Sequence, residues 1–377
     1  MPPPHPHFEH TTNLYKYMHS VTAKSSTRIE YIDALRGFTM ILVVFAHVEW
    51  FTFDMKASFS LINELFMSFR MPLFFFISGF ISYKENVEWN RQTWCSMSKK
   101  KMLVQIIPTL VFGIAYTCLY LKVSPEMFVA SHTKLGYWFT VVLFEMFLLV
   151  YTMNYALHLC PQRKQKTLKL IGLVCLTAGL FLARLVPVIF PSCQYVFDIL
   201  CLHQTIKYFP FFAFGYICSM YKDIFNKYLE NKYATTSIIV LFAVMFYVMV
   251  TYLTPNKDAS IIIFFTEIIV EIIAGILGLL IVYNTFKTYA QNFTSEKKAG
   301  RALQSIGRRT LDIYLLHYFF LPYLPQLKDI ISDSNNSVLE LAIGGSISIC
   351  VIWTCMVVSN ILRTSPILGK YLFGAKN

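Results

Sequence analysis

Residues 28–47 read RIEYIDALRGFTMILVVFAH, a run apolar enough to cross a bilayer that nevertheless contains charged and titratable side chains. A charge at the centre of a membrane helix costs roughly 3 kcal/mol, so such residues usually face a bundle interior or a wet cavity. Arg36 and His47 are eleven positions apart. In an α-helix this spacing places both side chains on one face, about 16 Å apart along the axis. That face is predicted to hold a permanent cation and a titratable imidazole, which suggests a reaction path through the membrane.

The composition is that of a membrane protein. The chain has 377 residues, of which 56% are hydrophobic and only 14% are charged, whereas a soluble domain averages about 25% charged residues. We therefore expect an all-α, polytopic membrane bundle of about ten transmembrane helices, of which the sixth and ninth are short enough to be broken or tilted. The ten apolar runs cover approximately residues 31–53, 62–83, 103–121, 137–157, 168–190, 208–221, 234–253, 260–283, 310–324 and 339–362.

Basic residues alternate between the connections of these runs. Most of the 33 Lys and Arg residues lie in the N-terminal tail, in every second loop and after the last run. Because cytoplasmic loops carry an excess of Lys and Arg, this pattern predicts that both termini are cytoplasmic. It also accounts for most of the net charge of +12 without a nucleic-acid partner. We expect a polar cytoplasmic tail over residues 1–30, a membrane domain over 31–366 and a short cytoplasmic tail over 367–377.

The sequence carries no sign of a metal site or of a transporter repeat. The nine cysteines are scattered, and none forms a C-x-x-C pair, so neither a zinc site nor a disulfide framework is expected. No duplication relates the two halves of the chain, whereas many transporters are built from repeats. These features favour neither a metalloprotein nor a carrier.

Four acidic or basic residues accompany His47 in the first run. Asp33 and Arg36 are three positions apart and can pair on one helix face, while Glu49 and Asp54 follow His47 near the predicted outer surface. These last two carboxylates could orient a sugar or the imidazole. The alternative is a structural Asp33–Arg36 pair and an interhelical hydrogen bond from His47.

A second polar position lies in the segment FRMPLFFFISGF over residues 69–80. Arg70 is placed in the outer half of the second run, a depth from which it could reach His47. Pro72 frees backbone carbonyls there, and Ser78 and Gly79 permit close helix approach. The alternative is an ordinary kinked packing helix whose arginine extends outward to the interface.

A third cluster lies in SIGRRTLDIYLLH over residues 305–317. Arg308 and Arg309 stand at the predicted cytoplasmic mouth, and His317 lies deeper. Guanidinium groups at a mouth suit phosphates, and Lys101, before the third run, has a comparable place. The alternative for these cations is plain flanking of membrane helices.

Three further charged residues lie within apolar runs. Glu267 and Glu271 are one helical turn apart and would repel each other unless paired or protonated. Arg184 is a candidate partner for them, although sequence alone does not show the contact.

These segments resemble acyltransferase family 3, the integral-membrane enzymes that acylate exported glycans in bacteria. The resemblance rests on YIDALRGF and FAH over residues 31–47, MPLFFFISGF over 71–80 and GRRTLDIYLLH over 307–317, in that order. It implies an acyl donor, usually acetyl-CoA, that approaches from the cytoplasm, and a hydroxyl acceptor, commonly on a sugar. It also implies that Arg36 and His47 are essential. Relatives often have His at the position of Arg70, and more arginine where this chain has Lys99–Lys101.

The resulting hypothesis is a bacterial inner-membrane O-acyltransferase with no metal, in which His47 is the general base. Arg36 would hold donor phosphates or polarise the thioester carbonyl, and Lys101, Arg308 and Arg309 would bind the nucleotide end of acyl-CoA. An acyl-histidine intermediate is an alternative. The acceptor would contact Arg70, Glu49, Asp54, Asp33 and His317.

Two other classes of function compete with this hypothesis. A proton-coupled transporter or glycan-precursor flippase would use His47, Arg36 and Glu267 as a proton relay, and a non-catalytic scaffold gives no reason to bury these charges. The sequence leaves open the acceptor, the acyl length and the oligomeric state.

Overall fold

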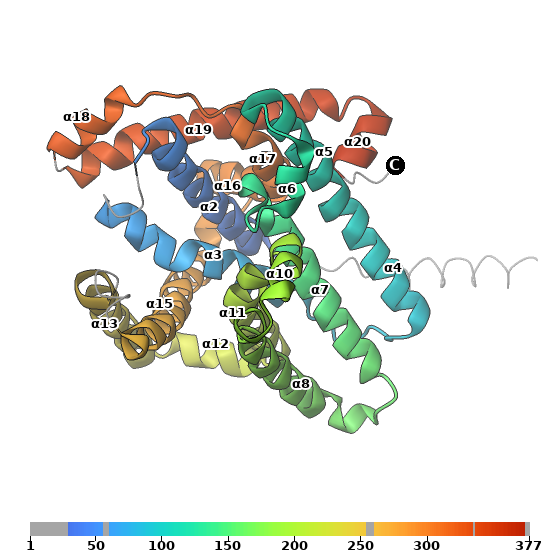
Figure 1. Ribbon diagram of the computed structural model, residues 1–377. Helices are drawn as coiled ribbons and strands as arrows, with labels where there is room; N and C mark the ends of the chain where they lie inside the picture. The colour runs from blue at the N-terminus through green and yellow to red at the C-terminus, as the bar shows by residue number, and fades with distance from the viewer. Residues whose placement is uncertain (1–28, 56–59, 254–259, 335, 374–377) are drawn as a thin grey trace, which may run out of the picture.

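The computed structural model describes residues 29–55, 60–253, 260–334 and 336–373, and these residues form helices and connections without a β-strand (Figure 1). Most of the predicted N-terminal tail, residues 1–28, lies outside the described residues. Among those described, eight helices are long and apolar enough to cross a membrane. These eight span Glu30–Thr52, Leu61–Ser82, Arg91–Leu121, Trp138–Ala156, Lys164–Ile189, Lys232–Leu253, Phe265–Thr288 and Ser337–Leu362. The chain is therefore an integral membrane protein with an all-α fold, as its composition predicts.

Several of these spans combine consecutive helical segments. The first comprises α2 (Glu30–His47) and the π-helical turn η1 (Val48–Thr52), and the second is α3 (Leu61–Ser82). The remaining segments are α4 (Arg91–Lys101), η3 (Met102–Ile106), α5 (Ile107–Tyr116), η4 (Thr117–Leu121), α7 (Trp138–Ala156), α8 (Gln162–Ala183), α9 (Val186–Ile189), α13 (Lys232–Val248), η7 (Met249–Leu253), α15 (Ile261–Thr288) and α19 (Ser337–Leu362).

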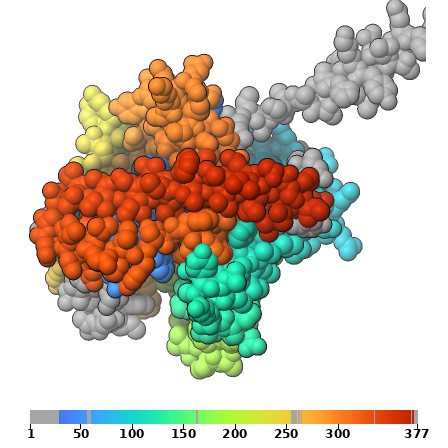
Figure 2. Space-filling view, turned by 90° about the horizontal axis from the view of Figure 1, so that it is seen from above, coloured from blue at the N-terminus to red at the C-terminus, as the bar shows by residue number. Residues whose placement is uncertain are grey.

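Shorter helices connect the long ones. They are α6 (Pro125–Ala130), η5 (Lys134–Gly136), η6 (Pro191–Cys193), α10 (Gln194–Ile199), α12 (Lys222–Glu230), η8 (Ala290–Phe293), α18 (Gln326–Ser334) and α20 (Pro366–Phe373). Helix α20 covers most of the predicted C-terminal tail and packs on α5, where the Phe112 and Phe373 ring centroids are 5.8 Å apart. Figure 2 shows α18, α19 and α20 lying across one face of the molecule.

The sixth and ninth apolar runs are the two that do not form a long apolar span in the described structure. The sixth corresponds to α11 (Leu202–Met220), which contains Pro210 and packs along α3. The ninth is broken: α16 (Lys298–Arg308) ends at Arg309, and the chain continues as α17 (Thr310–Leu316) and η9 (His317–Phe319). Irregular backbone at membrane depth requires burial in protein, and most of α17 is buried. A count of ten complete crossings stays a prediction.

Helix α2 lies at the centre of the bundle, in contact with α3, α15, α16, α17 and α19 (Figure 1). It crosses α16 at two glycines. A Cβ atom added to Gly37 would lie 2.0 Å from the Leu303 carbonyl oxygen, and one added to Gly307 would lie 1.8 Å from the Asp33 carbonyl oxygen. Only glycine permits the two backbones to approach this closely. The crossing fixes Arg36, next to Gly37, beside the start of α17.

Candidate active site

His47 is the last residue of α2 and lies at the junction with the π-helical turn η1. Its half-buried ring stacks on the ring of His317, with centroids 4.9 Å apart and an interplanar angle of 29°. His47 Nδ1 is 3.0 Å from His317 Nε2, and His47 Nε2 is 3.2 Å from the Tyr318 hydroxyl oxygen. Both ring nitrogens of His47 therefore contact polar atoms of η9.

The hydrogen-bond network assigns the proton positions of the two neutral imidazoles. His317 Nδ1 is 2.8 Å from the carbonyl oxygen of Tyr314, and a carbonyl can only accept. His317 Nδ1 therefore carries the proton, and its Nε2 accepts a hydrogen bond from His47 Nδ1–H. The lone pair of His47 is then on Nε2. His317 is 0% exposed and contacts His47 directly, and a direct substrate contact by His317 stays a prediction.

A strained loop holds the other side of this network. Lys134, Leu135 and Gly136 have φ angles of 48°, 49° and 107°, a left-handed conformation that is costly for the first two residues. The Gly136 carbonyl accepts a hydrogen bond from the Tyr314 hydroxyl at 2.9 Å. The single proton of the Tyr318 hydroxyl is shared between this carbonyl, at 3.3 Å, and His47 Nε2, at 3.2 Å. The loop thus fixes both tyrosines next to the histidines.

Lys134 secures the loop from the opposite side. Its ammonium donates hydrogen bonds to three backbone carbonyls, those of Val129, Ser131 and Asp198, at 2.7 to 2.8 Å. Burial lowers the pKa of Lys134, although Cys201 and Asp198 act in the opposite direction. The three carbonyls thus satisfy an ammonium that is only 4% exposed.

A cavity of about 140 Å³ adjoins His47. Met40 and Val43 line it together with His47 at helical spacing, and Arg36 continues this stripe of α2 by one more turn. Arg36 itself does not line the cavity, so a path shared by Arg36 and His47 stays a prediction. The remaining lining residues are Trp50, Met67, Arg70, Met71, Phe74, Gly136, Trp138, Phe139, Tyr208 and Tyr314.

Arg70 is the one cation that lines this cavity among the described residues. It is only 5% exposed, and its guanidinium lies 4.9 Å from the centroid of the Trp50 ring. Its Nη1 atom has no hydrogen-bond partner in the described part of the chain. A buried guanidinium with an unused donor is suited to bind a developing negative charge or a substrate oxygen.

The two carboxylates that follow His47 occupy different environments. Glu49 is fully buried, close to Arg70 and to the carboxyl group of Glu340 in α19. The Ser60 hydroxyl donates a hydrogen bond to Glu340. Asp54 is exposed in a left-handed turn after η1, with φ of 56°. Glu49 is thus buried close to Arg70, whereas Asp54 lies on the surface near the same end of α2.

Arg36 lies at the other end of the site. Its Nη2 donates to the Thr310 hydroxyl at 2.9 Å, and its Nη1 is 3.9 Å from Asp33 Oδ1. The ammonium of Lys101 lies 3.4 Å from the centroid of the Phe147 ring and close enough to Arg36 to interact with it electrostatically. The structure therefore places Asp33, Arg36 and Lys101 in one region.

The two arginines before α17 lie in different environments. Arg308 is exposed, whereas Arg309 is half-buried and donates to the Ser359 hydroxyl at 3.1 Å. Sequence reasoning missed Arg363, which forms two hydrogen bonds of 2.9 and 3.0 Å to Asp312. This ion pair attaches α17 to the end of α19.

Tyr318 was also missed, although it directly follows His317 in the sequence. Among the residues that the structure describes, it is the Tyr318 phenol that contacts His47 Nε2. The sequence feature that could have indicated this role is the largely apolar run Ile313–Phe319, in which tyrosines recur at helical spacing. Such residues combine core packing with hydrogen bonding.

Fold and site together define an integral membrane protein with an imidazole-centred site between a buried cation and a basic end. A comparison with known protein families agrees with the membrane fold and with a catalytic site. The profile of a family described as an acyltransferase domain matches residues 29–357, and the chain belongs to this acyltransferase family. Membership of the family indicates an acyltransferase enzyme.

The chain is also similar to several curated bacterial proteins. Glucans biosynthesis protein C of Salmonella paratyphi B, of Salmonella dublin and of Salmonella enteritidis PT4 is in each case 23% identical over 231 residues. The match covers 52% of this chain and 59% of each relative. The chain thus spans about three fifths of the length of the curated relatives it matches. No solved structure matches it.

Proposed function

We propose that this protein is a membrane O-acyltransferase that transfers an acyl group from acyl-CoA to a hydroxyl group of a glycan, with His47 as the general base. The observation that carries the proposal is the chain of hydrogen bonds from His47 through His317 to the Tyr314 carbonyl. It leaves the basic lone pair on His47 Nε2, which the Tyr318 hydroxyl contacts, and His47 itself lines a cavity. The small volume of about 140 Å³ supports acetyl as the acyl group.

In the proposed reaction the acceptor hydroxyl gives its proton to His47 Nε2 while its oxygen attacks the thioester carbonyl. The C–O bond forms, the tetrahedral intermediate collapses with cleavage of the C–S bond, and the CoA thiolate takes up the proton from His47. An imidazole suits this exchange because it gains and loses a proton near neutral pH. An acyl-histidine intermediate would instead require Nε2 to attack the carbonyl itself.

The donor end is proposed to lie at Arg36. Because α2 is continuous from Glu30 to His47, Arg36 and His47 are separated by about 16 Å along the axis. This distance supports a phosphate-binding role for Arg36 rather than contact with the thioester. An extended pantetheine arm can span the same distance. Lys101 lies beside Arg36, and Arg308 and Arg309 precede its partner Thr310, so all four cations are proposed to bind the nucleotide end.

Arg70 is proposed to stabilise the negative charge that develops on the thioester oxygen. It lines the same cavity as His47 and has an unused donor, and preorganised cations at such positions supply a large share of catalysis. Glu49 lies close enough to Arg70 to interact with it electrostatically, and the exposed Asp54 is proposed to contact the acceptor. Asp33 lies beside Arg36, far from this end, which supports a role in orienting that cation.

The acceptor class and the location are proposed from the relatives and from the charge pattern. The relatives are named for glucan biosynthesis, so we propose a glucan or another exported glycan as acceptor. The basic loops support cytoplasmic termini and ten crossings, and the bacterial relatives support the inner membrane of a bacterium.

The His47→Ala variant tests this function. Purified protein in liposomes is expected to release free thiol from acetyl-CoA slowly by itself and faster with added glucan. The variant should release thiol at a rate lower by roughly 100-fold or more. His132 is exposed, so His132→Ala is the matched control and should retain turnover. Full activity of His47→Ala at normal expression would exclude His47 from the chemistry.

The same assay separates the enzyme from a carrier. A proton-coupled transporter or flippase would leave acetyl-CoA intact in every variant. Glu267, the third member of that relay, lies in α15 and does not line the His47 cavity in the described structure. This placement supports the transferase over the relay.

A further inference from the structure

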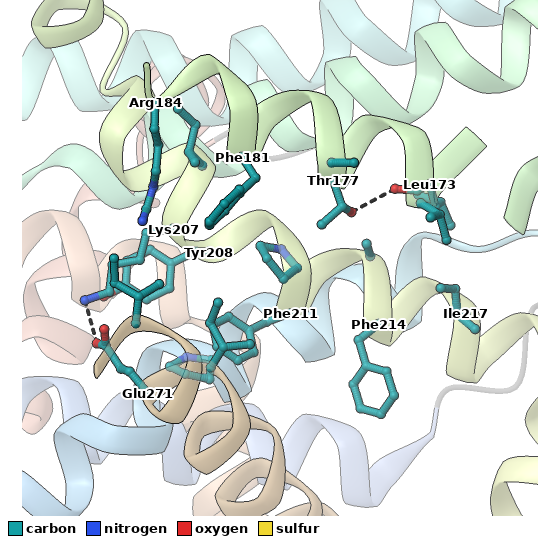
Figure 3. Close-up of a pocket in the computed structure, with 18 of the residues that line it drawn as sticks. Leu173, Thr177, Phe181, Arg184, Lys207, Tyr208, Phe211, Phe214, Ile217 and Glu271 are labelled. Atoms are coloured by element: carbon teal, nitrogen blue, oxygen red, sulfur yellow. Dashed lines mark hydrogen bonds and ion pairs between the residues drawn. The ribbon is translucent and has the colours of Figure 1, made fainter. Parts of the chain in front are cut away.

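A second cavity, of about 690 Å³, lies between α3, α8, α11 and α15. Figure 3 shows that its two ends differ in character: Arg184, Lys207 and Glu271 gather at one end, and the other end is lined by Leu173, Phe214 and Ile217. The cavity therefore has the polarity of an amphiphile, with a short charged part and a long apolar part.

The charged end has an excess of positive charge. Lys207 Nζ is 2.6 Å from Glu271 Oε1, and Arg184 lies close enough to Glu271 to interact electrostatically. Within the described residues the Arg184 guanidinium forms no hydrogen bond or ion pair, and it lies 5.6 Å from the centroid of the Phe181 ring. Two cations thus share one lining carboxylate, and one guanidinium retains its donors for an anion.

The cavity is accessible to the bilayer. Helix α8 contributes Val174, Phe181 and Leu182 to its wall, and these lining residues are themselves 57%, 44% and 64% exposed at the protein surface. A hydrocarbon chain can therefore enter from the membrane without crossing a polar barrier. An apolar cavity that opens to lipid favours a lipid over a water-soluble ligand.

The charged end adjoins the proposed catalytic cavity. Met67 and Tyr208 line both cavities. The Tyr208 ring stacks on Trp138, which lines the His47 cavity, with ring centroids 5.4 Å apart. A group attached to a headgroup at Arg184 and Lys207 would therefore lie beside the wall of the His47 cavity.

We propose that this second cavity binds a lipid with a phosphate headgroup, whose phosphate contacts Arg184 and Lys207 and whose hydrocarbon chain extends toward Leu173 and Ile217. If the proposed transferase function holds, this lipid carries the acceptor hydroxyl to His47, so the acceptor is presented on a lipid phosphate. The lipid site itself stands on the cavity and its charges.

Binding can be measured without turnover. Native mass spectrometry of the purified full chain, with dioleoyl phosphatidic acid or uncharged dioleoylglycerol added, is expected to show preferential binding of the phosphatidic acid. Arg184→Gln should weaken that binding about tenfold, because a charge-assisted hydrogen bond is lost, while Arg184→Lys should retain part of it. Arg91 is exposed in α4, so Arg91→Gln is the matched charge control.

A second variant tests the apolar part of the site. Ala178 lines the cavity, and Ala178→Phe should fill it and reduce the binding of both lipids while the thermal unfolding midpoint stays near that of the wild type. Inorganic phosphate should not compete with phosphatidic acid. Equal binding of the two lipids, full competition by phosphate, or unchanged binding in both Arg184→Gln and Ala178→Phe would overturn the lipid site.

The His47→Ala variant keeps the two proposals distinguishable. It should bind phosphatidic acid as the wild type does, because His47 does not line the second cavity. Normal lipid binding with no acetyl-CoA turnover in the wild type would reject the transferase and leave the lipid site. Normal acetyl-CoA turnover by a protein that shows no preference between the two lipids would reject the lipid site and leave the transferase.

Discussion

The two ring nitrogens of His47 have different partners, and this difference makes His317 a positioning residue. His317 Nε2 accepts from His47 Nδ1 at 3.0 Å and so keeps the basic lone pair on Nε2. We expect His317→Ala to lower kcat by roughly 100-fold, the scale of general-base catalysis, with little change in the KM for acetyl-CoA. Steady-state kinetics with acetyl-CoA as the varied substrate measure both constants.

A conservative variant distinguishes orientation from mere packing. Gln can offer a side-chain carbonyl oxygen to His47 Nδ1–H, so His317→Gln should recover part of the lost kcat. If the Ala and Gln variants have equal kcat, or if KM alone rises, His317 does not orient the base.

Arg70 is the second residue whose role can be separated by kinetics. Among the described residues, Arg70 is the one cation that lines the His47 cavity. Arg70→Gln should therefore lower kcat by about 100-fold or more, as the loss of an oxyanion donor does. Arg70→Lys should be less impaired because it keeps the charge but not the fork of donors. Thiol release at saturating acetyl-CoA measures the effect.

The stability of each Arg70 variant provides the control for this measurement. Each should keep the thermal unfolding midpoint of the Arg91→Gln protein within a few degrees. A rise in KM for the acceptor without a change in kcat would contradict a role in the transition state.

At the scale of the helices, the crossing of α2 and α16 determines where the donor cations lie. A Cβ at position 37 would meet the Leu303 carbonyl at 2.0 Å, so Gly37→Ala should force the helices apart at a cost of about 1–3 kcal/mol. Arg36 would then lose its hydrogen bond to Thr310, and the KM for acetyl-CoA should rise. Thermal unfolding in detergent and donor saturation curves report the two effects.

Gly179→Ala is the matched control for this helix contact. Gly179 lies in α8, and a Cβ there would have no heavy atom within 4 Å. The substitution should therefore be neutral or slightly stabilising, since alanine favours helix. Equal effects of the two substitutions would show that the α2–α16 crossing tolerates separation.

The elements also show which parts of the site were accessible from the sequence. The stripe from Arg36 to His47 could be predicted because helix geometry fixes positions within one segment. The partners of its two ends could not, since Thr310 and His317 lie 274 and 270 residues away along the chain. Their contacts depend on how α16 and α17 pack on α2, which periodicity does not encode. The ninth apolar run reflected burial in protein more than a continuous helix.

At the scale of the whole molecule, the position of the site relative to the membrane decides whether an acyl group changes sides. Asp54 is exposed beyond the His47 end of α2, and Arg308 is exposed near its Arg36 end. The alternation of basic residues predicts that Arg308 faces the cytoplasm and Asp54 the outside. A donor held near Arg36 and an acceptor near Asp54 would then meet at His47 from opposite surfaces.

Cysteine labelling in cells tests this orientation. A membrane-impermeant maleimide should modify an Asp54→Cys variant in intact spheroplasts, whereas it should modify an Arg308→Cys variant only after the membrane is permeabilised, each compared with the labelling of the parent protein. The parent is needed because Cys95, Cys118, Cys175 and Cys350 are exposed at the protein surface. Labelling of both variants from the same side would place the two ends of α2 on one surface. Transfer across the membrane along this helix would then be impossible, even if His47 remained the catalytic base.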